Sequence, residues 1–133
     1  MNGVIIEKLD AFTDARGWSV HPVDYGRLSN GGIDNIHVVS MAPGAVRGNH
    51  FHKEQTEDVF IFGGPCRLVL RDTATGAVEE LTIDEGRLTR IRLSPGIAHA
   101  FQNTGEGISY LVCSSERRFS PESPDTFREA LIP

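Results

Sequence analysis

The chain has 133 residues and a formal net charge of -5, which is the length of one ordinary domain with a single core. An acidic balance excludes the broad basic surface that nucleic acids and anionic membranes require. No apolar run approaches the roughly 20 residues of a membrane span and no secretory signal is evident, so we expect one cytoplasmic domain over residues 1–133.

Short apolar runs recur along the whole chain, separated by glycine, proline, asparagine or aspartate. Their length and spacing are typical of an all-β sandwich or barrel. The predicted strands cover residues 4–8, 18–22, 36–41, 48–52, 57–62, 67–72, 78–83, 89–93, 98–103 and 108–114. Cys66 and Cys113 lie inside such runs, and we expect them to be buried thiols rather than a disulfide.

Two segments depart from the strand pattern. Residues 28–34 show no periodicity and predict a loop near the mouth of the barrel. Near the C-terminus, Ser123 can cap a helix and Pro124 suits its first position. The sequence therefore predicts either a short helix of one or two turns over residues 126–131 or a tail, because so short a helix needs packing to be stable.

Three histidines and one glutamate have the spacing of a metal site. His50 and His52 are two residues apart, so both side chains project from the same face of a strand. Glu57 begins the next apolar run, and His99 lies in a distant predicted strand. Because neutral imidazole and carboxylate are the ligands that borderline divalent ions prefer, we expect one bound ion, zinc first, with iron, nickel or manganese as alternatives.

Four arginines alternate along two predicted strands: Arg67, Arg71, Arg90 and Arg92. If they lined the barrel they would favour an anionic ligand, but a solvated outer face is the usual reason for such alternation and is the favoured interpretation. Arg47 differs because it lies directly before the histidine pair.

The motif spacing resembles that of the cupin family. Its first motif is matched by Gly44, His50, His52, Glu57 and Gly64, and its second motif by Gly96, His99 and Asn103, with Pro95 one place late. The resemblance implies an antiparallel jelly-roll barrel, the double-stranded β-helix. It also implies that the metal ligands are the three histidines and the glutamate of these motifs.

Longer stretches are similar to a narrower group within the cupins. Residues 12–18, 46–50 and 95–101 resemble the dTDP-4-dehydrorhamnose 3,5-epimerases. Residues 119–127 resemble the C-terminal cupin of the bifunctional capsular-polysaccharide reductase and epimerase. The resemblance implies an isomerase that acts on a nucleotide-linked 4-keto-6-deoxy hexose.

The same resemblance implies roles for individual residues. His50 would be the base and Arg47 would contact the nucleotide diphosphate, although a metal-bound His50 could not also accept a proton. Tyr110 is the candidate proton donor, with ordinary strand packing as the favoured interpretation. Metal-assisted removal of a proton beside a keto group is the mechanism we favour.

Other functions remain open from the sequence. A non-catalytic cupin that binds a sugar and a metal-dependent dioxygenase both fit the ligand set. A homodimer is expected from the resemblance and from the tendency of unpaired strand edges to add another chain.

Overall fold

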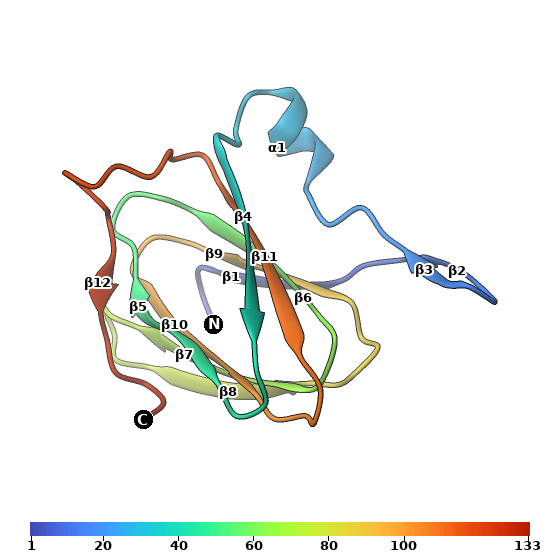
Figure 1. Ribbon diagram of the computed structural model, residues 1–133. Helices are drawn as coiled ribbons and strands as arrows, with labels where there is room; N and C mark the ends of the chain where they lie inside the picture. Colours follow the sequence, from blue (N-terminus) through green and yellow to red (C-terminus); the bar gives the residue numbers. More distant parts are fainter.

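The computed structural model describes residues 1–133 and contains two five-stranded antiparallel sheets that face each other (Figure 1). One sheet has the order β1 (Val4–Lys8), β9 (Thr89–Leu93), β6 (Glu57–Phe62), β11 (Ser109–Ser115) and β4 (Asn35–Met41). The other has the order β12 (Phe127–Arg128), β5 (Val46–Phe51), β10 (Ile97–Asn103), β7 (Cys66–Asp72) and β8 (Val78–Ile83). The expected all-β barrel is confirmed.

Alternating side chains from the two sheets form the core. Val59 and Ile61 of β6 and Ile91 of β9 belong to one cluster with Leu68 and Leu70 of β7, and each is at most 1% exposed. Burying one such side chain contributes about 1.5–3 kcal/mol. Because every second residue of a strand faces this core, a slip by one residue would expose the whole set, which fixes the register of each strand.

Two small elements precede β4. β2 (Phe12–Asp14) and β3 (Gly17–Ser19) form a hairpin that projects from the barrel in Figure 1. The helix α1 (Tyr25–Ser29) begins after Asp24, whose carboxylate accepts hydrogen bonds from the N–H groups of the first turn. The strand predicted over residues 18–22 ends at Ser19, and the first two residues of the loop predicted over residues 28–34 belong to α1. No helix has the length and apolar character needed to cross a membrane.

The predicted C-terminal helix over residues 126–131 is wrong. Phe127 and Arg128 form β12, which pairs with β5, and Asp125 has a φ of 49° in the left-handed region. Farther on, Ile132 packs with Val69 and Ala100. A helix of one or two turns has little stability of its own, so contacts with the barrel determine the conformation of this segment.

Candidate functional site

Three imidazoles converge inside the barrel. His50 belongs to β5, His52 follows directly after that strand, and His99 belongs to the neighbouring strand β10. The ring centroids of His50 and His99 are 4.7 Å apart, and those of His50 and His52 are 5.0 Å apart. One ring nitrogen of each residue lies within 4.8 Å of the other two, which is close enough for all three to bind one ion.

A β-bulge in β5 brings Arg47 to the same face as His50. The pairing of β5 with β10 skips Asn49, whose φ of 55° is left-handed. Such an extra residue reverses the alternation of side chains along the strand. Arg47 and His50 therefore both line the barrel cavity, although they are three residues apart and regular alternation would separate them.

Hydrogen bonds on the far side of two rings determine which nitrogen faces the cluster. The Nδ1 atom of His52 lies 2.7 Å from the main-chain oxygen of Asp125, and that of His99 lies 3.0 Å from the main-chain oxygen of Ile97. A carbonyl oxygen only accepts, so each Nδ1 atom donates its proton to it, and in the neutral form of each ring the lone pair lies on Nε2. These two Nε2 atoms are buried without a hydrogen-bond partner. The arrangement is the one in which histidine ligates a metal.

The electrostatic environment suits a cation. Desolvation and the neighbouring His52 lower the pKa of His50 to about 4, and desolvation, with His50, lowers that of His99 to about 3. Both rings are therefore neutral at neutral pH, the form that ligates metals. The Glu57 carboxylate lies 3.7 Å from the Nε2 atoms of His52 and of His99, and burial raises its pKa. The structure thus brings all four predicted ligands together, with Glu57 at the edge of the histidine cluster.

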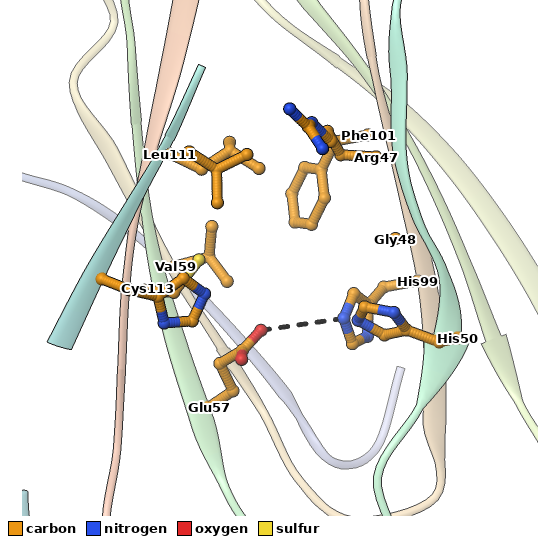
Figure 2. A pocket seen from close by; sticks show the side chains of 11 residues that line it. Arg47, Gly48, His50, Glu57, Val59, His99, Phe101, Leu111 and Cys113 are labelled. Atoms are coloured by element: carbon orange, nitrogen blue, oxygen red, sulfur yellow. Dashed lines mark ion pairs between the residues drawn. The ribbon is translucent and has the colours of Figure 1, made fainter. Parts of the chain in front are cut away.

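Two cavities meet at this cluster. One has a volume of about 230 Å³, and Figure 2 shows His50, His99 and Glu57 at one end of it, with a dashed line between Glu57 and His99. Its other walls are largely apolar and are formed by Val39, Val59, Phe101, Leu111 and Cys113. The second cavity, of about 180 Å³, is lined by His52 and Arg117 and shares His50 and Glu57 with the first. A ligand in either cavity can therefore reach the cluster.

Arg47 supplies a positive charge to the first cavity. It is exposed, and its guanidinium donates hydrogen bonds only to the main-chain oxygen of Ser40, at 3.2 and 3.3 Å. No carboxylate lies within ion-pair distance of it. An arginine that no acidic group neutralises, at the mouth of a partly apolar cavity, favours an anionic ligand.

The four alternating arginines lie on the outer faces of the sheets; Arg67 and Arg71 are solvated there, as the favoured interpretation predicted, whereas Arg90 is largely covered, with a side chain 12% exposed. Each of them is occupied by an ion pair with an acidic residue: Arg67 with Glu80, Arg71 with Glu129, Arg90 with Glu7 and Arg92 with Asp58. None of them lines the cavity at the cluster. Arg47 is thus the arginine that the first cavity offers to a ligand.

Tyr110 does not reach the site. Its neighbour Leu111 and Cys113 line the cavity, so alternation along β11 turns Tyr110 to the outer face. There its ring stacks on Phe62, with 5.1 Å between the centroids. The proposal of Tyr110 as proton donor is therefore wrong, and ordinary strand packing accounts for this residue.

His37 is a cavity residue that the sequence interpretation missed. It lies on β4, in the sheet opposite β5, and it lines both cavities. No side-chain hydrogen bond or ion pair engages its ring, and partial desolvation lowers its pKa although the residue is exposed. The signal was present in the strand pattern, because His37 shares a face with Val39, which packs against the core.

Both cysteines are free and buried, as expected. Cys66 belongs to the core cluster, and burial raises its pKa to about 11. Cys113 lines the first cavity opposite His37 on the adjacent strand, and burial raises its thiol pKa above the ordinary value. Both groups are therefore protonated at neutral pH and act as small apolar side chains.

Comparisons with known proteins relate this fold to polysaccharide and sugar-nucleotide proteins. A family model described as the polysaccharide biosynthesis C-terminal domain matches residues 13–127. A search of curated proteins finds no match. The structure is similar to the capsular polysaccharide assembling protein CapF from Staphylococcus aureus, with a TM-score of 0.69 and 20% identity. That match covers 92% of this chain and 33% of CapF, so the chain spans about a third of that protein.

The matches to two further structures cover a larger share of those proteins. A dTDP sugar isomerase from Desulfovibrio desulfuricans G20 has a TM-score of 0.83 and 16% identity, over 97% of this chain and 85% of the isomerase. The 3'-monoepimerase ChmJ from Streptomyces bikiniensis has a TM-score of 0.76 and 21% identity, over 95% of this chain and 69% of ChmJ. At these identities the structures establish a shared fold, the cupin-type jelly roll that the motifs implied. Because the family model spans most of the sequence, the chain belongs to the polysaccharide biosynthesis C-terminal domain family.

Proposed function

We propose that this domain is a sugar-nucleotide epimerase or isomerase, which removes and returns a proton beside the keto group of a 4-keto-6-deoxy hexose. The observation that carries the proposal is the convergence of three imidazoles on one point, with His50, His99, Glu57 and the unpaired Arg47 lining one barrel cavity. Proteins of the same fold support it: ChmJ, a 3'-monoepimerase, forms a complex with dTDP-quinovose, and NovW is a 4-keto-6-deoxy sugar epimerase.

The cofactor in this proposal is one divalent metal ion, with zinc first and iron, nickel or manganese as alternatives. Its ligands are His50, His52, His99 and Glu57. The orphaned Nε2 atoms of His52 and His99 fit this role, because a buried acceptor without a partner is costly unless it binds something. When bound, the ion supplies a Lewis acid that stabilises negative charge on a substrate oxygen. Elemental analysis of the purified protein identifies the ion.

Two side chains of the cavity perform the remaining tasks. Arg47 binds the diphosphate of the nucleotide, since phosphate oxygens match the donors of a guanidinium group. His37 transfers the proton, because its ring faces the same cavity and has no other partner. His50, the base that the family resemblance implies, serves as a metal ligand instead, since a ligating nitrogen has no lone pair left for a proton.

Solvent exchange tests this proposal. In D₂O we expect the wild-type protein to introduce deuterium at C3 of a dTDP-linked 4-keto-6-deoxy hexose, as followed by NMR. The variant His37→Gln should exchange roughly 100-fold more slowly, which is the usual cost of losing a positioned acid or base. The matched control is His21→Gln, because His21 lies outside the cavities and bonds to Tyr25.

The other outcomes separate the competing functions. Tight binding of the nucleotide sugar without exchange would contradict an epimerase and indicate a sugar-binding cupin. Turnover that requires molecular oxygen would indicate a metal-dependent dioxygenase. Equal exchange rates in the His37→Gln variant and the wild type would remove His37 from the mechanism and leave the reaction itself intact.

Replacement of Arg47 tests the anion site. In Arg47→Gln we expect the affinity for dTDP, measured by calorimetry, to fall at least about tenfold, because a charge-assisted hydrogen bond to phosphate contributes about 1.5–3 kcal/mol. The control is Arg67→Gln, whose side chain pairs with Glu80 on the outer face. Equal losses in the two variants would indicate a general effect of net charge rather than a phosphate site.

The homodimer stays a prediction, and we propose a second copy of this chain as the partner of the outer face of β4 and β11. This face carries exposed apolar side chains, among them Ile36 and Val38 at 53% and 65% exposure. β4 is also an edge strand of its sheet. Exposed apolar area beside an open edge is the usual signature of a protein interface.

A further inference from the structure

The C-terminal segment contacts the loop that follows the histidine strand. The Asp125 side chain is buried, and its two carboxylate oxygens accept hydrogen bonds from three successive main-chain N–H groups. The distances are 2.8 Å to Lys53, 3.1 Å to Glu54 and 3.0 Å to Gln55. This one side chain therefore fixes the backbone between β5 and β6, which is the connection between His52 and Glu57.

The same residue also orients His52. Its main-chain oxygen accepts the Nδ1 proton of His52 at 2.7 Å, which leaves the Nε2 lone pair directed into the cluster. The left-handed φ of Asp125, 49°, lets one residue direct its carboxylate to the loop and its carbonyl to the ring. Aspartate tolerates this conformation better than most residues.

A second attachment holds the segment on the other side of His50. The side chain of Asn49, the bulged residue, accepts hydrogen bonds from the N–H groups of Leu131 and Ile132 and donates one to the main-chain oxygen of Ile132. Between the two attachments, β12 pairs with β5 in a register that places Arg128 opposite His50. The C-terminal segment thus follows the outer edge of β5, the strand that carries His50 and ends directly before His52.

We infer that Asp125 is a positioning residue of the metal centre, which holds His52 and the loop after it in the geometry that binds the ion. The inference rests on the proposed function, because it concerns the same metal. Outer partners of a ligating histidine fix its tautomer and ring orientation, and their loss commonly lowers metal affinity 10–100-fold. Here the partner comes from a segment 73 residues farther along the chain.

The variant Asp125→Asn tests the inference with almost no change in shape. Both carboxylate oxygens accept hydrogen bonds, so the amide NH₂ of asparagine must face at least one main-chain N–H donor. We expect zinc affinity, measured by competition with a chelator, to fall at least about tenfold. We also expect the visible absorption spectrum of the Co²⁺-substituted protein to change, because that spectrum reports the ligand geometry.

A control variant distinguishes the positioning of His52 by Asp125 from the general attachment of the C-terminal segment to the barrel. Arg71→Gln removes the 2.7 Å ion pair to Glu129, which also ties the segment to the barrel but does not contact His52. We expect this variant to keep the zinc affinity and the Co²⁺ spectrum of the wild type.

Folding of the variants is checked separately. If Asp125→Asn does not fold, Asp125→Gly replaces it, since glycine accepts the left-handed φ and keeps the carbonyl group. Wild-type zinc affinity together with an unchanged Co²⁺ spectrum, in either folded variant, would overturn the inference alone. Wild-type protein that binds no zinc or cobalt would overturn both the inference and the proposed metal site.

Discussion

Replacing His52 by alanine should abolish metal retention while the barrel stays folded. The change removes one of the three imidazoles whose nitrogens lie within 4.8 Å of one another, and Glu57 is not a member of that cluster, so only two well-placed ligands remain. His52 follows the end of β5 and lies outside the main core cluster, so its loss leaves the packing between the sheets intact. Elemental analysis should find about one zinc ion per wild-type chain and almost none in His52→Ala.

Thermal unfolding gives an independent measure of the same effect. An ion that binds only the folded state stabilises it by about 2.7 kcal/mol when its concentration is a hundred times its dissociation constant. The melting temperature of the wild type should therefore rise when zinc is added, and that of His52→Ala should not. His21→Ala serves as the control, because His21 pairs with Tyr25 outside the barrel. Full metal occupancy in His52→Ala would disprove the ligand assignment.

The convergence of the histidines was predictable from the sequence, because the His50–His52 spacing is a local feature and the motif around His99 marks a second strand of the same barrel. His50 and His52 project from one face because they are two residues apart at the end of one strand, and β10 pairs with that strand directly opposite His50. The barrel was predictable for a similar reason. Each apolar run has the length of one strand, and the two faces of a strand differ in burial. The run lengths and their alternation therefore predict the strands, and the short spacing between runs predicts a sandwich or barrel.

The features that escaped prediction depend on contacts between distant segments. Ser123 and Pro124 form a helix-start signal, but the carboxylate of Asp125 is bound by the backbone of residues 53–55, about 70 positions away. The bulge at Asn49 likewise has no local signature apart from the preceding glycine. Strand packing, the favoured interpretation of Tyr110, agrees with the structure, whereas His37 was missed because the face that it shares with Val39 was not considered.

Gly48→Ala should reduce both the stability of the barrel and its metal affinity. Gly48 has a φ of 90°, and a Cβ atom there would lie 2.7 Å from the main-chain oxygen of His99. Together the left-handed conformation and the overlap should cost about 3 kcal/mol of unfolding free energy, measured by urea denaturation. The overlap is resolved only if β5 and β10 move apart, and that movement separates His50 from His99.

Gly44→Ala isolates the contribution of the close approach. Gly44 also has a positive φ, 79°, but its Cβ would meet no atom within 4 Å, so only the conformational cost of about 1 kcal/mol applies. If zinc affinity falls in Gly48→Ala and not in Gly44→Ala, the spacing between the two strands sets the geometry of the cluster. Equal losses of stability and affinity in the two variants would mean that backbone conformation alone matters, and that the site tolerates a wider separation of its histidine strands.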